Sequence, residues 1–393
     1  MKEFSPDEIK YLTEHENAAP SHLMLQAGRY PHLPVSQLVQ HIGARQKIKN
    51  KLPTWYQHPQ VRYLVALSVE QSSSEKTAAF KAGLVAGNLL LDVTGGFGID
   101  TFFFAAKFNT VIYVERQSEL VAIAANNARV LGKNNILFEQ GEVASFLESF
   151  TGLADWIYLD PARRDQANRK LHSLNDCEPD VVELLPALLA KGKNILIKTS
   201  PMLDITQAIG QLQKVQKVYV VAVENECKEV LYHIGALENP NLIIETINLL
   251  PENRKEAFTF NYANEENTPV NYALPQTYIY EPNAAILKAG GFKSLADQYQ
   301  INKLHRNSHL YTSENLVAAF PGRTFKLKTI SRYQKKELTA HLPERKANIT
   351  VRNFPDSVAE IRKKTGTKEG GDIYLFATTD LNSKPVILIC EKA

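Results

Sequence analysis

Cysteine is scarce in this sequence: Cys177, Cys227 and Cys390 are the three cysteines among 393 residues. None of them has a second cysteine three positions away, so neither a disulfide framework nor a CxxC metal or redox site is expected. No apolar run approaches the ~18–20 residues that a membrane-spanning helix requires. Residues 1–9 are polar and acidic and do not resemble a secretion signal. These absences predict a soluble, cytoplasmic protein.

Net charge is small, because 45 Lys and Arg residues nearly balance 42 Asp and Glu residues, but it is unevenly distributed. Residues 322–393 contain 15 Lys and Arg against 8 Asp and Glu, so this stretch carries +7 and the rest of the chain −4. Such asymmetry indicates an anionic partner, for which nucleic acid is a candidate. A solvated basic face without a partner is the alternative.

The spacing of apolar residues changes near residue 86. Before it, apolar residues recur at helical intervals in segments such as Ser36–Ile48 and Val61–Val69, which predicts a helical N-terminal region over 1–85. Over 86–236, short apolar runs alternate with helix-length segments. This alternation predicts an α/β domain with a Rossmann-like parallel sheet that helices cover on both faces.

The remaining sequence predicts a different arrangement. The runs Val218–Val223 and Val230–Ile234 are too close for a helical crossover, so they should form an antiparallel pair at the end of the sheet. Residues 237–320 read as a linker followed by a further unit. Residues 321–393 show four candidate strands and a helix over Asp356–Lys364, with Asp356 as its N-cap. Both C-terminal units are therefore expected to be α+β.

A glycine-rich loop follows the first predicted strand of the α/β domain, within Leu89–Asp100. Its glycines are Gly95, Gly96 and Gly98. Glycines at this place let the backbone turn sharply and approach a ligand closely. Asp92 precedes them, and Glu115 ends the next strand 23 positions later, where an acid can accept hydrogen bonds from both ribose hydroxyls. A tight turn without a ligand is the alternative.

The fourth predicted strand ends in Asp160, followed by Pro161 and Arg163. Ligands of open α/β sheets bind at the carboxyl ends of the strands, so Asp160 should lie beside the glycine loop. The proline makes the turn after it rigid.

These motifs, in this order, resemble those of class I S-adenosylmethionine-dependent methyltransferases. Asp92 and the glycines resemble the methionine-binding motif, Glu115 the ribose-binding acid, and Glu142 the acid that contacts adenine. Asp160 to Arg163 resemble the catalytic D-P-P-Y or N-P-P-Y loop of amino-methylating members. The resemblance implies the cofactor-binding residues Asp92, Thr94, Gly95, Gly96, Gly98, Glu115, Glu142 and Asp160. It implies the catalytic residues Asp160, Pro161, Arg163 and Lys198, and no metal.

A closer resemblance extends over most of the chain, to a bacterial family of THUMP-like-domain methyltransferases. The segments that carry it are Glu70–Ala79, Thr94–Thr101, Asp160–Arg164, Asn225–Glu229 and Tyr280–Asn283. The resemblance implies a ferredoxin-like unit within 237–320 and a THUMP-like unit at 321–393. THUMP domains are associated with RNA modification, so it also implies RNA, either tRNA or rRNA, as the substrate.

The methylated atom is left open by the sequence. Arg163 stands where amino-methylating enzymes carry an aromatic residue, and an arginine there can stack on a base, bind a phosphate or be a surface cation. Pyrimidine C5 methylation needs a thiolate, and no cysteine follows the fifth strand at Lys198. Cys177 and Cys227 are expected to be incidental. C5 chemistry is therefore disfavoured.

Ribose 2′-O methylation is a weaker possibility. It commonly uses a Lys-Asp-Lys-Glu set, to which four residues correspond in order: Lys81, Asp160, Lys198 and Glu226. Four ionisable residues can align in this way by chance. His305 and His309 have the spacing of two metal ligands, but no third ligand lies near them in the sequence, so no metal site is expected.

Four serine and threonine residues precede the first strand: Ser72, Ser73, Ser74 and Thr77. They could cap a helix or bind the carboxylate of the cofactor.

The sequence thus predicts an S-adenosylmethionine-dependent RNA methyltransferase whose C-terminal module binds RNA. The alternatives are a methyltransferase for a small molecule or a protein, and a non-catalytic RNA-binding protein that keeps the cofactor fold. An NAD-dependent enzyme is less consistent with the Asp160 motif.

Overall fold

The structure of the chain is a computed structural model. It describes residues 3–63, 72–163, 173–235, 241–342 and 344–393, and statements about absent features below refer to these residues. The predicted helix at Val61–Val69 falls largely outside them.

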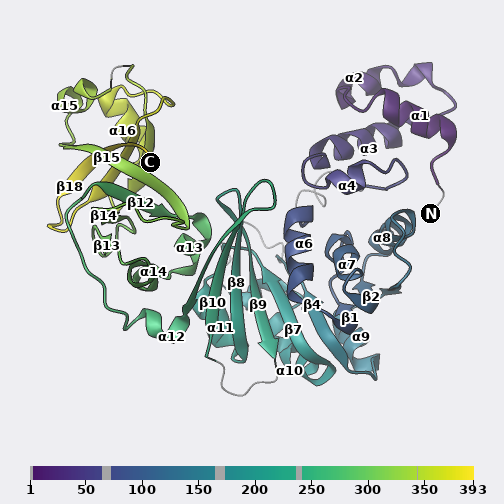
Figure 1. Cartoon of the computed structure of the whole chain (residues 1–393). Coiled ribbons are helices and arrows are strands. Elements are labelled where there is room, and N and C mark those ends of the chain that lie inside the picture. Colours follow the sequence, from purple (N-terminus) through teal and green to yellow (C-terminus); the bar gives the residue numbers. More distant parts are fainter. Residues whose placement is uncertain (1–2, 64–71, 164–172, 236–240, 343) are drawn as a thin grey trace. The chain divides into compact units, whose positions relative to one another are not determined.

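The chain divides into two units (Figure 1). The first comprises Met1–Gln216 and Val230–Pro240, and the second comprises Lys217–Glu229 and Asn241–Ala393. We describe each unit separately.

Short helices form the N-terminal region, as predicted. They are α1 (Pro6–Glu14), α2 (Pro20–Leu25), η1 (Ala27–Arg29), α3 (Val35–Ile48) and α4 (Pro53–Tyr56). A proline occupies the first turn of α1, α2 and α4, where its fixed φ suits a helix start and its missing N–H costs nothing. Ser5 caps α1 and forms a capping box with Glu8.

A Rossmann-like sheet forms the centre of the first unit, which confirms the predicted fold class. Its strands are β1 (Gly87–Asp92), β2 (Phe108–Glu115), β3 (Ile136–Gln140), β4 (Ala154–Leu159), β7 (Gly192–Thr199) and β9 (Glu226–Gly235). The first five are parallel in the order β3-β2-β1-β4-β7, and β9 runs antiparallel to β7. The carboxyl ends of β1, β2 and β4 therefore lie at one edge of the sheet.

Helices follow the strands of this sheet in alternation, as expected for a parallel sheet. They are α6 (Glu75–Leu84), α7 (Ile99–Phe104), α8 (Ser118–Val130), α9 (Val143–Ser149), α10 (Val181–Lys191) and α11 (Ile205–Leu212), with the short η2 (Leu174–Asp176). After β4, the two-residue strand β5 (Ala162–Arg163) pairs with β6 (Cys177–Glu178).

The N-terminal helices pack against the helices beside the glycine loop. Trp55 is 1% exposed and its ring lies 5.6 Å from that of Phe97 in the loop, between centroids. Ile99 of α7 and Leu120 of α8 belong to the same buried cluster. Burial of a large apolar side chain contributes roughly 1.5–3 kcal/mol. The loop is thus anchored in a hydrophobic core on one side.

Two sheets contribute to the second unit. In the first, β10 (Ile243–Leu249) runs parallel to β8 (Val215–Val223) and antiparallel to β11 (Lys255–Asn261), which α12 (Tyr262–Glu265) follows. The second sheet has the strand order β13-β14-β12-β15-β18-β17-β16.

The seven strands of this second sheet are β12 (Tyr278–Pro282), β13 (Asn302–Lys303), β14 (Tyr311–Ser313), β15 (Gly322–Ser331), β16 (Asn348–Arg352), β17 (Tyr374–Thr379) and β18 (Pro385–Lys392). Its helices are α13 (Ala284–Ala289), α14 (Phe292–Tyr299), α15 (Lys335–Ala340) and α16 (Val358–Thr365). The sheet is continuous because β12 pairs with β15. The stretches predicted as two C-terminal units therefore share one sheet.

The start of α16 differs from the prediction. Its N-cap is Ser357, which forms a capping box with Glu360, and not Asp356. Asp356 instead accepts hydrogen bonds from the Tyr333 hydroxyl and from Nζ of Lys364. Ser357 caps the helix because its hydroxyl accepts from the backbone N–H of Glu360, whereas the Asp356 carboxylate is bound by side chains more distant in the sequence.

Candidate active site at the carboxyl ends of β1, β2 and β4

The glycine loop between β1 and α7 has a conformation that requires glycine at each position. A Cβ on Gly95 would lie 2.2 Å from the ring of Tyr113, which is fully buried. Gly96 and Gly98 have φ values of +53° and +81°, in the left-handed region that disfavours other residues. The Tyr113 hydroxyl donates to the Gly96 carbonyl at 2.6 Å, which fixes the turn. The result is a rigid cradle of backbone at the sheet edge.

Asp92 lies beneath this loop and is 1% exposed. Its carboxylate accepts hydrogen bonds from the Thr101 hydroxyl and, at 3.3 Å, from the Thr94 backbone N–H. Burial raises the pKa of Asp92 to about 7, although these hydrogen bonds oppose the shift. Near neutral pH the carboxyl group is thus poised between its two protonation states, and a nearby cation would favour the ionised one.

Glu115 at the end of β2 faces the glycine loop. Its carboxylate accepts from the backbone N–H groups of Gly96 at 3.1 Å and Gln117 at 2.9 Å. The structure therefore brings together the acid and the loop that the sequence paired. Glu142 is exposed and stands at the N-cap of α9, just after β3.

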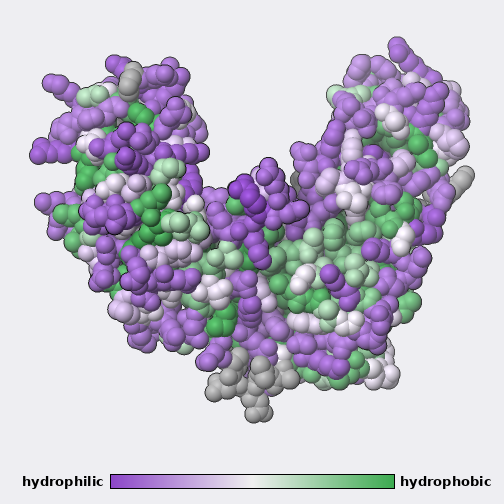
Figure 2. Space-filling model, in the orientation of Figure 1, coloured by the Kyte–Doolittle hydropathy of each residue, from purple (hydrophilic) through white to green (hydrophobic). Residues whose placement is uncertain are grey.

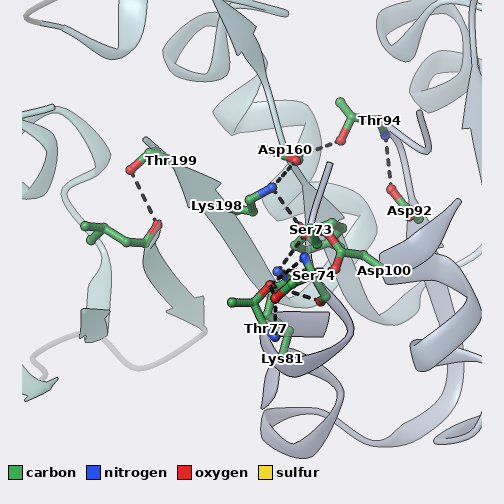
Figure 3. Close-up of polar contacts among 12 residues, drawn as sticks. Ser73, Ser74, Thr77, Lys81, Asp92, Thr94, Asp100, Asp160, Lys198 and Thr199 are labelled. Carbon is green, nitrogen blue, oxygen red and sulfur yellow. Dashed lines mark hydrogen bonds and ion pairs between the residues drawn. The ribbon is translucent and has the colours of Figure 1, made fainter. Parts of the chain in front are cut away.

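Asp160 at the end of β4 is joined to the same loop. Its backbone N–H donates to the Thr94 hydroxyl at 2.6 Å, and its carboxylate forms an ion pair with Lys198 of β7 (Figure 3). The Asp160 side chain remains 35% exposed, whereas the Lys198 side chain is 11% exposed. Pro161, which follows, is buried. The arrangement leaves part of a carboxylate open to a ligand and fixes its other oxygen.

A buried polar network lies behind this ion pair, and sequence reasoning missed most of it. The Ser73 hydroxyl donates to Asp100 at 2.9 Å and accepts from Lys81 at 3.0 Å and from Lys198 at 3.4 Å (Figure 3). Nζ of Lys81 also lies 3.2 Å from the Asp100 carboxylate, which accepts from the Tyr158 hydroxyl at 2.7 Å as well. The two lysines, Lys81 and Lys198, thus balance the charges of two aspartates, Asp100 and Asp160.

The protonation of Asp100 follows from this network. Burial by itself raises the pKa of this carboxyl group, but Lys81, Lys198 and the hydrogen bonds from Tyr158 and Ser73 outweigh burial, so the pKa is lowered. Asp100 therefore stays ionised. Lys81 is fully buried and lies 3.2 Å from this carboxylate, so its charge is already paired.

The serine and threonine residues before β1 have distinct places in the structure. Ser74 caps α6 and forms a capping box with Thr77, whereas Ser73 points into the buried network. These contacts explain the positions of Ser73 and Ser74, and no bound cofactor is needed to explain them.

Other candidate residues have different partners or lie outside the described region. Arg163 belongs to β5, and its side chain lies outside the part of the chain that the structure describes, as do Arg164 and Arg169. Glu226 pairs with Lys228. The Lys-Asp-Lys-Glu set therefore reduces, within the first unit, to the ion pair of Asp160 with Lys198 and the buried Lys81.

The cysteines and histidines singled out from the sequence occupy structural positions. Burial raises the pKa of the Cys227 thiol to about 11, which opposes thiolate formation, and Cys177 is buried. His309 stacks on Phe292, with ring centroids 3.6 Å apart, and His305 is hydrogen-bonded to Asn353. No group of three His, Cys, Asp or Glu side chains in the described ranges could hold a metal ion. Within the same ranges no helix combines the length and apolarity needed to span a membrane.

Family models match three stretches of the chain. Residues 87–182 match the model of RNA cap guanine-N2 methyltransferases, residues 278–321 a ferredoxin-like domain, and residues 322–392 a THUMP domain-like family. The first match contains the glycine loop, Glu115 and Asp160. The other two meet within the shared sheet of the second unit.

Known proteins extend these matches. A curated protein of Thermotoga maritima, described as an uncharacterized RNA methyltransferase, is 26% identical over 120 residues, which are 29% of this chain. The match covers 27% of that relative's length. A crystal structure from Porphyromonas gingivalis W83, described as that of a methyltransferase, is 34% identical over 100% of both chains, with a TM-score of 0.89. The chain therefore belongs to the bacterial family of THUMP-like-domain methyltransferases and has a class I, S-adenosylmethionine-dependent catalytic domain.

Proposed function

We propose that the protein transfers a methyl group from S-adenosylmethionine to a nitrogen atom of an RNA base. The observation that carries this proposal is the convergence of the glycine cradle, Glu115 and the partly exposed Asp160 at one sheet edge. We further propose the domain limits 1–85, 86–236, 237–320 and 321–393.

The residues at this edge fit the cofactor. Its amino group suits the buried Asp92 carboxyl group, its ribose diol suits Glu115, and its adenine suits Glu142. Thr94 and the loop backbone at Gly95, Gly96 and Gly98 complete the proposed site. The cofactor supplies an electrophilic methyl group on its sulfonium. The protein contributes positioning and electrostatics.

Asp160 is the proposed catalytic residue. Its exposed oxygen accepts a hydrogen bond from the N–H of the acceptor and takes the proton that the nitrogen releases as it gains the methyl group. Lys198 holds the other oxygen, so the carboxylate keeps one orientation. Pro161 fixes the turn that carries it. Arg163 takes the place of an aromatic platform and is proposed to stack on the base or bind its phosphate.

Two competing acceptors fit the site less well. Ribose 2′-O methylation by a Lys-Asp-Lys-Glu set needs both lysines near the hydroxyl group, but Lys81 is buried against Asp100. C5 methylation needs a thiolate, but the pKa of Cys227 is raised. The match to guanine-N2 methyltransferases supports an exocyclic amine as the acceptor.

RNA as the substrate class has three supports: the THUMP-like match, the +7 charge of residues 322–393, and the name of the Thermotoga maritima relative. The finer proposal is tRNA or rRNA in the cytoplasm. A small molecule or a protein as acceptor, and RNA binding without catalysis, are the alternatives.

The test is mass spectrometry of nucleosides from the RNA of a deletion strain complemented with wild-type protein or with Asp160→Ala. One methylated nucleoside should be absent from the deletion strain, return with wild-type protein and stay absent with the variant. Identical nucleoside profiles in all three strains would reject an RNA substrate. Return of the nucleoside with Asp160→Ala would reject the assigned role of Asp160.

A further inference from the structure

Glu281 of β12 joins the ferredoxin-like and THUMP-like parts by charge. Its side chain is 3% exposed, and its two carboxylate oxygens are bound by different arginines. Arg323 of β15 donates to Oε2 from Nε at 2.8 Å and from Nη2, and Arg352 of β16 donates to Oε1 at 2.9 Å. We call these three residues the carboxylate clasp.

The clasp shows how the seven-stranded sheet is shaped. Glu281 and Arg323 are direct partners across the β12–β15 pair, but β16 is the edge strand and three strands separate it from β12. A flat sheet would hold Arg352 far from Glu281. The sheet must therefore curl until its edge returns toward β12. The buried side chains on its inner face include Ile279, Phe325 and Phe376.

Positive charge exceeds negative charge at the clasp. Two guanidinium groups share one carboxylate, so the clasp has a net charge of +1. The Arg323 and Arg352 side chains remain 42% and 33% exposed, whereas Glu281 is buried. The acid therefore anchors the arginines from beneath, and their remaining surface is open to solvent.

A buried lysine acts on the same histidine as one arginine of the clasp. Lys303 is 3% exposed, and burial lowers its pKa to about 8, a shift that Glu265 partly opposes. Burial, followed by the charges of Lys303 and Arg352, lowers the pKa of His309 to about 4. Lys303 and Arg352 thus both act on His309, which lies within the ferredoxin-like match.

We propose that the carboxylate clasp binds a backbone phosphate of RNA, an inference that rests on the proposed RNA substrate. Glu281 occupies Nε and Nη2 of Arg323 and Nη2 of Arg352, so the remaining guanidinium N–H groups would donate to the phosphate. Charge-assisted hydrogen bonds of this kind are strong. Because Glu281 already fixes both arginines, little side-chain freedom is lost on binding. The +1 charge of the clasp complements the −1 charge of one phosphodiester. The site would fix the RNA across both C-terminal parts.

The competing explanation is that the clasp only closes the sheet. The two explanations differ most clearly for Glu281→Gln. The amide oxygen of the glutamine still accepts a hydrogen bond from an arginine, but the negative charge that competes with phosphate is gone, so a phosphate site predicts tighter RNA binding despite a lower Tm. A purely structural clasp predicts unchanged or weaker binding.

The experiment measures filter binding of total tRNA and of a single-stranded RNA oligonucleotide to the full-length protein, without cofactor, over a salt series. Arg323→Gln and Arg352→Gln should each weaken binding roughly tenfold at low salt. Each should also reduce the salt slope by about 0.7 for the oligonucleotide. The control is Arg332→Gln, which removes the same charge from an exposed position outside the clasp.

Arg352→Gln and Arg332→Gln weakening RNA binding equally would overturn the proposal. So would weaker binding by folded Glu281→Gln. Methyl transfer from labelled cofactor is measured separately on the same RNA. Loss of methyl transfer in the wild-type protein, with the binding differences intact, would reject the enzyme function and not the clasp.

Discussion

The catalytic domain and the C-terminal module distribute charge in opposite ways. In the network behind Asp160, the charges of Lys198 and Lys81 balance those of Asp160 and Asp100. In residues 322–393, 15 cationic side chains exceed 8 acidic ones. Figure 2 shows a mainly hydrophilic surface where Figure 1 places α15 and α16. The first pattern pairs charges that are mostly buried, and the second leaves charge exposed to water.

This difference predicts different responses to substitution. A buried ion whose partner is removed remains uncompensated, so the loss is large and depends little on salt. Exposed charges interact weakly and are screened, so their effects are small and fall as salt rises. Substitutions in the catalytic domain and in the module can therefore test the comparison directly.

The largest effect is expected for Asp160→Ala. The variant loses the proposed proton acceptor and should slow methyl transfer by roughly 10²–10⁴-fold, the range typical of general base catalysis. Transfer of labelled methyl groups to RNA measures the rate, and circular dichroism checks the fold. Asp160→Asn keeps the shape but not the charge, so it should also be slow. A wild-type rate in either variant would contradict the proposed role.

Lys81→Met should have the next largest effect, on stability. It leaves Asp100 buried without its lysine, which costs about 3–5 kcal/mol of unfolding free energy. The matched control is Lys328→Met, because Lys328 pairs with Glu391 at an exposed position and should cost at most about 1 kcal/mol. Urea unfolding measures both. Equal losses of unfolding free energy would show that the buried ion pair contributes no more to stability than the exposed one.

The double variant Lys81→Met/Asp100→Asn sharpens this test. Removing the second charge should recover part of the stability lost in Lys81→Met, since no uncompensated ion then remains. Additive losses would mean that the two charges do not interact.

Much of the catalytic domain is predictable from local sequence. The alternation of short apolar runs with helices determines a parallel sheet, and in such a sheet Asp92, Glu115 and Asp160 necessarily end strands at the same edge. The three glycines are recognisable because their backbone conformation excludes other residues. The fold class and the arrangement of these residues therefore follow from the sequence.

The buried network is not predictable in this way. Ser73 and Lys198 are 125 positions apart, and no periodicity relates them. The sequence proposes Lys81 for a Lys-Asp-Lys-Glu set, but its buried ion pair with Asp100 is apparent only once α6 is placed against α7. Likewise, the pairing of β12 with β15, which joins the ferredoxin-like and THUMP-like units in one sheet, depends on a tertiary register that the sequence pattern does not show. The local sequence pattern therefore does not predict contacts between segments that are far apart in the sequence.

Cofactor binding should respond to Glu115→Ala without dependence on salt. The variant loses the acid proposed to bind the ribose, which should cost about 1.5–3 kcal/mol or roughly 10–150-fold in affinity. Glu119→Ala is the control, because Glu119 is an exposed acid four residues later on α8. Calorimetry measures both. Unchanged affinity for S-adenosylmethionine in Glu115→Ala would reject the assignment.

The pH dependence of cofactor binding tests Asp92. Its folded-state pKa of about 7 lies above its ordinary value, so its carboxyl group is protonated below that pH. If binding requires the ionised form, affinity should fall about tenfold per pH unit below 7 and level off above it. Calorimetry between pH 5.5 and 8.5, on the order of six points, shows the profile. Asp92→Asn should bind weakly with a flat profile, and a flat wild-type profile would contradict the proposal.

The same group affects the free protein in the opposite sense. Because folding raises the pKa of Asp92, its contribution to stability is fully present below the unfolded pKa and is lost as pH rises through about 7. Cofactor binding should offset this loss at neutral pH. Thermal unfolding with and without S-adenosylmethionine measures the difference.

The smallest effects are expected on the basic surface of the C-terminal module. Deleting residues 322–393 would remove β15, the partner of β12, so charge reversal is the cleaner test. Lys363 and Lys364 are exposed on α16, but Lys364 forms a 2.5 Å ion pair with Asp356. Lys363→Glu should therefore weaken RNA binding several-fold and leave stability nearly unchanged.

Lys364→Glu should in addition destabilise the end of α16, because it replaces an ion pair by two adjacent acids. Both variants should bind S-adenosylmethionine like the wild type. The RNA-binding loss of Lys363→Glu should shrink as salt rises, because each phosphate contact contributes about 0.7 to the salt slope for a single strand. Filter binding at several salt concentrations measures this trend. A loss independent of salt would mean that Lys363 acts through the fold, and the contrast between paired buried charge and available surface charge would fail at this position.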